Sequence, residues 1–154
     1  MAIESVDVLR KSQIAGILEQ ICQTLELTPS QHDLAKTRYE AVGAWLAGSD
    51  NALLKSVTIY PQGSVAIGTT VRPLGRDEHD VDLICYVAGL GVDLAPAALK
   101  YSIGERLWTN GHYKDLLEEK PRCWRLNYAN EFHLDITPSI TNPRCSAGGE
   151  IDSL

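Results

Sequence analysis

Asp80 and Asp82 lie two residues apart in an apolar, partly β-branched stretch that predicts a β-strand. Because side chains alternate along a strand, both carboxylates point to the same face. Two acidic groups side by side in a half-buried place repel each other, and a divalent cation is the usual means of neutralising them. The pair therefore indicates a metal site.

Asp135 lies in a second predicted strand, where it shares one face with His133 and Thr137. If this strand pairs beside the first, three carboxylates converge, and hard oxygen ligands suit Mg²⁺ or Mn²⁺ better than zinc. Two such ions about 3.5–4 Å apart would activate an attacking hydroxyl and steady a leaving pyrophosphate. We predict phosphoryl-group chemistry with two ions, and an ordinary hydrogen-bonded role for His133. The predicted catalytic and metal-binding residues are Asp80, Asp82 and Asp135.

Gly63 and Ser64 follow a predicted strand over 57–60 and precede a predicted short helix that ends near Thr70. Glycine permits a tight strand-to-helix turn, and we expect Ser64 to cap the helix. Backbone N–H groups at a helix N-terminus attract anions, which suits the β- and γ-phosphates of a nucleoside triphosphate. Nearby positive charge would come from Arg72 and Arg76.

Two segments carry a resemblance to a known superfamily: residues 61–73, PQGSVAIGTTVRP, and residues 76–83, RDEHDVDL. They resemble polymerase-β-type nucleotidyltransferases, and most of all the bacterial relatives of cyclic-GMP-AMP synthase and oligoadenylate synthetase. These relatives are cyclic-oligonucleotide synthases of anti-phage defence. The resemblance is specific over about residues 57–90 and reappears at 131–138.

The resemblance implies a role for each matching residue. Asp80 and Asp82 would hold the metals, and Asp135 would complete the metal site and help to activate the attacking hydroxyl. Gly63 and Ser64 would bind the triphosphate. Two further residues fit the nucleotide-binding loop pattern, Gln62 and Thr69.

The function implied is a nucleotidyltransferase that uses ATP, GTP or other NTPs to make a cyclic di- or oligonucleotide messenger. One alternative is a small enzyme that adenylylates a protein, as in toxin–antitoxin systems. Another is a catalytically silent nucleotide-binding module. The two predicted leading helices and the spacing between Asp82 and Asp135 favour the synthase.

The composition indicates which class of protein this is but does not identify its function. The chain has 154 residues, of which 44% are apolar and 22% charged, as in an ordinary soluble domain. A net charge of −6 argues against a long nucleic-acid partner. No signal peptide or membrane-spanning stretch is visible, so we expect a cytoplasmic protein with no membrane partner.

The expected architecture is α+β, a polymerase-β-like palm whose mixed sheet carries helices mainly on one face. Two leading helices, over 3–25 and from Pro29 to about Ala47, occupy residues 1–50, and the catalytic sheet occupies 57–138. Further helices are predicted over 96–108 and 113–119, followed by a hairpin of 122–128 with 131–138. The resemblance implies a helical lid domain after the third carboxylate. We expect residues 1–154 to be the catalytic core alone. The chain would then be either a fragment or a compact nucleotidyltransferase that depends on a lid-supplying or regulatory protein partner.

Overall fold

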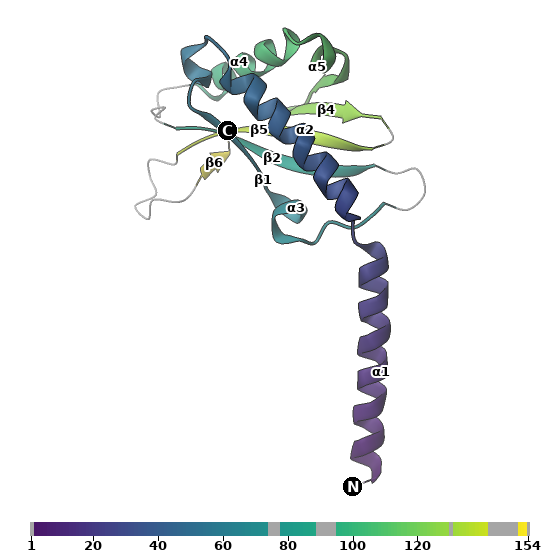
Figure 1. Ribbon diagram of the computed structural model, residues 1–154. Helices are drawn as coiled ribbons and strands as arrows, with labels where there is room; N and C mark the ends of the chain where they lie inside the picture. The colour runs from purple at the N-terminus through teal and green to yellow at the C-terminus, as the bar shows by residue number, and fades with distance from the viewer. Residues whose placement is uncertain (1, 74–77, 89–94, 130, 142–150, 154) are drawn as a thin grey trace.

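The computed structural model describes residues 2–73, 78–88, 95–129, 131–141 and 151–153, with the backbone alone for 2–7, 96 and 151–153. Arg76, which the sequence predicts to add positive charge near the phosphates, lies outside the described residues. The fold is α+β, with helices packed on a mixed sheet (Figure 1). Among the helices described, none combines the length and the apolar character needed to cross a bilayer.

The sheet runs in the order β1-β2-β5-β4-β3, and β6 pairs with the end of β5. β2 and β5 are parallel to each other, and every other pairing is antiparallel. The parallel pair occupies the middle of the sheet, which brings together two strands that are distant in the sequence. The strands are β1 (Val57–Pro61), β2 (His79–Val87), β3 (Leu117–Glu119), β4 (Trp124–Tyr128), β5 (Phe132–Thr141) and β6 (Ile151–Ser153).

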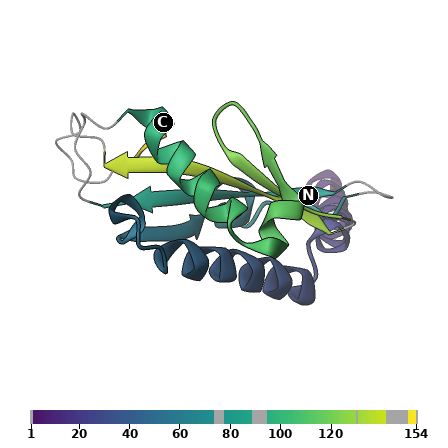
Figure 2. The same cartoon turned by 90° about the horizontal axis from the view of Figure 1, so that it is seen from above.

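Helices α2, α4 and α5 pack on one face of this sheet (Figure 2). The predicted capping box at the start of α2 is present, because the Thr28 side chain accepts from the Gln31 backbone and the Gln31 side chain accepts from the Thr28 backbone. The helices are α1 (Ala2–Leu25), α2 (Pro29–Ala47), the 3₁₀ turn η1 (Ala52–Leu54), α3 (Gly63–Ile67), α4 (Pro96–Trp108) and α5 (Gly111–Leu116).

Two segments differ from the sequence-based expectation. The helix predicted to reach Glu119 ends at Leu116, and residues 117–119 form β3 instead. Pairing of Leu117 with Leu126 across β3 and β4 explains the change, because a backbone edge on β4 supplies hydrogen bonds that a longer helix would forgo. Strand β6 was not predicted at all.

The core lies between the sheet and these helices. Alternate residues of β2, from Val81 to Val87, are buried on the helix side together with Leu134 and Ile136 of β5. They pack with α2 and α4 residues that include Val42, Leu46, Leu99, Ile103 and Leu107. Because strand residues alternate, Asp80 and Asp82 point to the opposite face, away from the core.

Helix α1 projects away from the rest of the chain (Figure 1). Its large apolar side chains are 49–66% exposed; they are Val8, Leu9, Ile14, Ile17, Leu18 and Ile21. At its end, the Leu25 carbonyl accepts from the Arg72 backbone, and Glu26 forms a β-bridge with Val71. The apolar stripe of α1 therefore adds little to the stability of the described domain.

We expect Ile17→Ala to change the free energy of unfolding by no more than about 0.5 kcal/mol, because Ile17 is exposed. Leu46→Ala should cost about 2–5 kcal/mol, because Leu46 is fully buried in the core. Urea denaturation followed by circular dichroism measures both. A loss in Ile17→Ala that matches Leu46→Ala would show that α1 packs on the domain.

Candidate active site

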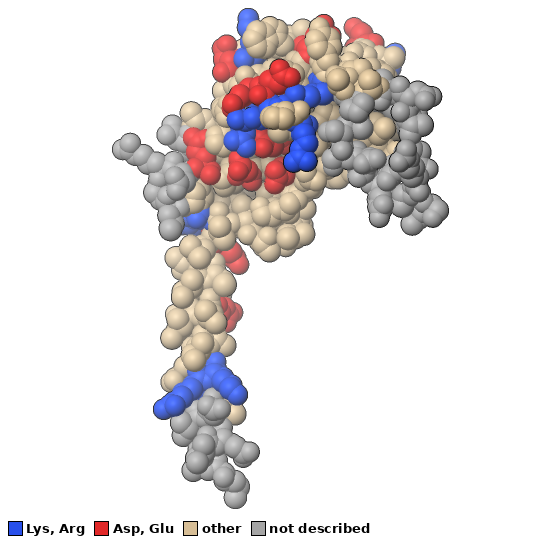
Figure 3. Space-filling model, turned by 180° about the vertical axis from the view of Figure 1, so that it is seen from behind, with Lys and Arg blue, Asp and Glu red and all other residues tan. Residues whose placement is uncertain are grey.

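The parallel pairing of β2 with β5 brings the predicted carboxylates together. Asp82 is the direct register partner of Asp135, and Asp80 is the partner of His133. All of these side chains lie on the face that α2 leaves open. Seen from that side, acidic side chains gather beside basic ones (Figure 3). The strand placement predicted from the sequence is thus the one observed.

Strand β4 adds a residue that the sequence reasoning missed. Arg125 lies opposite Asp135, and its Nε and Nη2 donate to Asp135 Oδ1 and Oδ2 at 2.6 and 2.7 Å. Its Nη2 also lies 3.1 Å from Asp80 Oδ1. The hydrogen bonds to Asp135 raise the pKa of Arg125 further above its usual value. A charged residue in the strand that precedes Asp135 was the signal available in the sequence.

The Asp82 carboxylate makes no hydrogen bond or ion pair with any side chain or backbone group that the structure describes. Burial raises the pKa of this carboxyl, and the negative charges of Asp135 and Asp80 raise it further. Asp82 is therefore the member of the triad whose charge is least compensated.

The donor chemistry of this face fits a hard divalent cation, because it presents carboxylate oxygens, and the Asp82 carboxylate lacks a partner among the residues described. Within the described parts of the chain, however, no three His, Cys, Asp or Glu side chains are already arranged to hold an ion. Arg125 takes two of the carboxylates instead. The residues that would hold a cation are Asp80, Asp82 and Asp135.

His133 joins Asp80 to Glu78. Its Nε2 lies 2.7 Å from Glu78 Oε2, and its Nδ1 lies 3.3 Å from Asp80 Oδ1. This agrees with the hydrogen-bonded sheet histidine expected from the sequence. Asp80 is consequently held from two sides, by His133 and by Arg125.

The Gly63 turn lies directly against Asp82. The Gln62 backbone N–H donates to the Asp82 carbonyl at 2.8 Å, and Gly63 has a φ of +60°. A Cβ at Gly63 would come within 2.7 Å of Asp82 Oδ2. Glycine is thus required twice, for its backbone conformation and for the space that the carboxylate occupies.

Ser64 does not cap α3, contrary to the prediction. The helix begins at Gly63 and its N-cap is Gln62, which makes no side-chain capping bond. The Ser64 hydroxyl instead accepts from the Thr70 hydroxyl at 3.0 Å. The helix ends at Ile67 rather than near Thr70, because Gly68 adopts the left-handed conformation.

Two other residues expected near the phosphates are placed as follows. The Thr69 backbone donates to the Ser64 carbonyl at 2.9 Å, while Thr70 is the residue whose side chain meets Ser64. The Arg72 guanidinium donates to the Glu26 carbonyl at 3.3 Å, so it points toward the end of α1.

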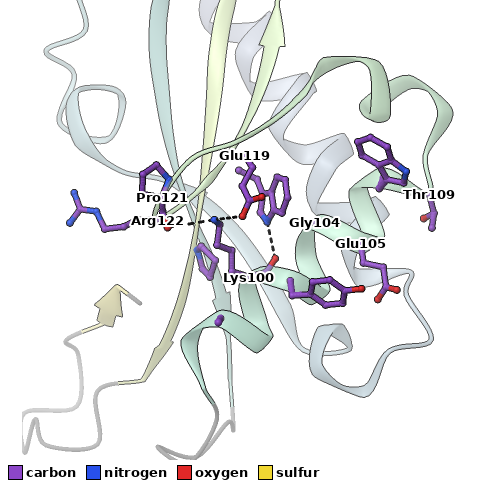
Figure 4. A pocket seen from close by; sticks show the side chains of 12 residues that line it. Lys100, Gly104, Glu105, Thr109, Glu119, Pro121 and Arg122 are labelled. Carbon is purple, nitrogen blue, oxygen red and sulfur yellow. Dashed lines mark hydrogen bonds and ion pairs between the residues drawn. The ribbon is translucent and has the colours of Figure 1, made fainter.

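A cavity of about 890 Å³ lies between α4 and the segment that joins β3 to β4 (Figure 4). Two of its lining residues, Lys100 and Glu119, form an ion pair at 2.8 Å. A third, Trp124, donates from Nε1 to the Lys100 carbonyl at 2.8 Å. Trp124 alternates with Arg125 along β4, so the cavity opens on the other face of the sheet from the carboxylates. No residue predicted for the site lines it.

A mixed sheet with paired carboxylates beside a Gly-Ser turn is the arrangement expected of a nucleotidyltransferase. Residues 57–138 match the family model described as cyclic GMP-AMP synthase DncV-like, nucleotidyltransferase domain. The chain belongs to this family.

Two known synthases are similar to this chain in sequence. A c-di-GMP synthase from Roseivirga ehrenbergii is 36% identical over 83% of this chain and 34% of its own length. The cyclic dinucleotide synthase CdnG from Bradyrhizobium diazoefficiens is 34% identical over 88% of this chain and 32% of its own length. The chain thus spans about a third of the length of these relatives.

Solved structures support the same fold. The structure of Bradyrhizobium diazoefficiens CdnG in complex with GTP superimposes with a TM-score of 0.70 and 33% identity, covering 90% of this chain and 40% of that one. The GTP-bound form of Vibrio cholerae DncV gives a TM-score of 0.64 at 13% identity, covering 87% and 52%, which shows the shared fold.

Gly63→Ala should destabilise the chain more than Gly68→Ala does. Both glycines have positive φ, so each substitution costs about 1–2 kcal/mol of backbone strain. A Cβ at Gly68 meets nothing within 4 Å, whereas a Cβ at Gly63 collides with Asp82. Chemical denaturation of the two variants measures the difference, and equal losses would contradict the close approach of Gly63 to Asp82.

In EDTA, Asp82→Asn should leave the chain as stable as the wild type or more stable, because it removes a repelled charge. Asp135→Asn should cost about 1.5–3 kcal/mol, because it breaks the pairing with Arg125.

The pH dependence has a defined sign. A raised pKa in the folded state means that the stability present below the unfolded pKa, about 3.9, is lost as pH rises through the folded pKa. Relative to Asp82→Asn, the wild type should lose stability from about pH 4 upward. Thermal melts across pH test this, and a less stable Asp82→Asn at neutral pH would contradict it.

Proposed function

We propose that this chain is the nucleotidyltransferase part of a cyclic dinucleotide synthase that consumes NTPs and acts in anti-phage defence. The observation that carries the proposal is the register of Asp82 with Asp135 across two parallel strands, beside the Gly63 turn. The relatives named above make cyclic dinucleotides, and one of them was solved with GTP. GTP is accordingly the first substrate to test.

In this proposal the three carboxylates hold divalent ions, Mg²⁺ or Mn²⁺. Ions bound there would activate the attacking hydroxyl and neutralise the leaving pyrophosphate. Asp135, oriented by Arg125, would accept the proton of the ribose hydroxyl, and Asp80 and Asp82 would hold the ions that neutralise the α-phosphate. The backbone of the Gly63 turn and the Ser64 hydroxyl bind the β- and γ-phosphates, with Gln62 and Thr69 beside them.

The match covers only about a third of the length of each relative. We propose that contacts to the base and ribose come from a lid outside the described residues, or from a partner protein. An enzyme that adenylylates a protein would use the same carboxylates and turn. A silent binding module would keep the turn and dispense with the paired carboxylates.

Incubation with labelled GTP and ATP in the presence of Mn²⁺, followed by separation of nucleotides from protein, distinguishes these functions. A labelled cyclic or linear dinucleotide supports the proposal, provided that Asp82→Asn abolishes it. Label on protein would show adenylylation. Nucleotide binding without any product would indicate the silent module.

Ser64→Ala should weaken NTP affinity roughly tenfold to a hundredfold. The substitution removes one charge-assisted hydrogen bond, worth about 1.5–3 kcal/mol, and leaves the backbone donors of the turn in place. Calorimetric titration of GTP with Mg²⁺ measures the effect. Ser56→Ala is the control, because Ser56 donates to the Ala88 carbonyl outside the turn. Equal affinity in the wild type and Ser64→Ala would remove Ser64 from the phosphate site.

A further inference from the structure

The three carboxylates are unequally attached to Arg125. Asp135 receives two hydrogen bonds, at 2.6 and 2.7 Å, and both side chains of this pair are mostly covered, with 21% and 16% exposed. Asp80 receives a single contact at 3.1 Å and is 54% exposed. Bidentate, shielded pairs are the strong ones, and single exposed contacts contribute little. The ion pair of Arg125 with Asp135 is therefore strong, and the contact of Arg125 with Asp80 is weak enough to be exchanged for another.

Arg125 cannot respond to an incoming cation by losing its proton, because a guanidinium stays charged in proteins. It can only shift its contacts. Asp80 has an alternative neighbour in His133, 3.3 Å away, so it keeps a partner when Arg125 withdraws.

Asp135 can serve Arg125 and a metal together. An ionised carboxylate offers about four lone-pair positions, and Arg125 takes two of them. Of the three negative charges on the triad, Arg125 cancels one and leaves two, which is the charge of one divalent ion. Asp82, which lacks a partner among the described residues, faces the Gly63 turn.

We propose that Arg125 is a positioning residue that acts as the internal counter-ion of the triad: it keeps its hold on Asp135 and releases Asp80 when a divalent cation binds. The inference rests on the proposed function for the cation, and on geometry alone for the counter-ion. In this role, Arg125 of β4 keeps the three carboxylates together before metal and nucleotide bind.

Arg125→Met keeps the apolar stem and removes the charge. The matched control is Arg122→Met, which makes the same change of net charge at an exposed arginine that pairs with no described residue. In EDTA, Arg125→Met should lower the thermal midpoint by roughly 5 °C and Arg122→Met should not. Arg125→Met combined with Asp135→Asn should recover most of the loss, because both charges of the pair are then gone.

Calorimetry with MnCl₂ alone supplies the second readout. Removal of a positive charge a few ångströms from the metal should tighten Mn²⁺ binding on the order of tenfold at low salt. Mn²⁺ should therefore raise the midpoint of Arg125→Met more than that of the wild type. A purely structural arginine would change the midpoint in EDTA and leave Mn²⁺ affinity as it is.

The outcomes separate this inference from the proposed function. If the wild type binds no Mn²⁺, the metal-dependent function fails, and the melts in EDTA still decide the counter-ion role. Equal melts for Arg125→Met and Arg122→Met overturn that role. Unchanged or weaker Mn²⁺ binding by Arg125→Met overturns the exchange at Asp80. If Arg125→Met does not fold, recovery of folding in the double variant supports the counter-ion role, and a double variant that also fails to fold overturns the proposal.

Discussion

The parallel pairing of β2 with β5 is the constraint on which the site depends. It sets Asp82 beside Asp135 on one face of the sheet, although the two residues are far apart in the sequence. The same pairing buries Val81, Leu83 and Leu134 against the helices on the other face. A slip of one residue would exchange the two faces, so the apolar core fixes the position of the carboxylates.

That placement brings three negatively charged carboxylates together, and the neighbouring strands pair with only some of them. Arg125 of β4 pairs with both Asp80 and Asp135, and His133 of β5 contacts Asp80. The Asp82 carboxylate has no direct partner among the described residues, and burial, together with the charges of Asp135 and Asp80, raises its pKa. The absence of a side chain at Gly63 leaves this carboxylate accessible from the turn. The acidic face thus keeps a negative charge that would attract a divalent cation.

The sequence predicted the features that depend on residues close together in the chain. These are the shared face of Asp80 and Asp82, the capping box of α2 and the strand context of Asp135. It did not predict Arg125, because the expected hairpin would pair Tyr128 with Glu131, whereas Tyr128 pairs with Phe132. One residue of register decides whether Arg125 faces the carboxylates or the core. The end of α5 and the cap of α3 were wrong because tertiary contacts, with β4 and with Asp82, overrode local propensity.

We propose that Asp82 and Asp135 hold a divalent cation next to the phosphates of a bound NTP. Anomalous diffraction from crystals of the chain grown with Mn²⁺ and a non-hydrolysable GTP analogue tests this directly. We expect a manganese peak within coordination distance of Asp82 and Asp135, with the triphosphate against Gly63 and Ser64. Ordered nucleotide elsewhere, or nucleotide at the turn with no manganese at these carboxylates, would contradict it.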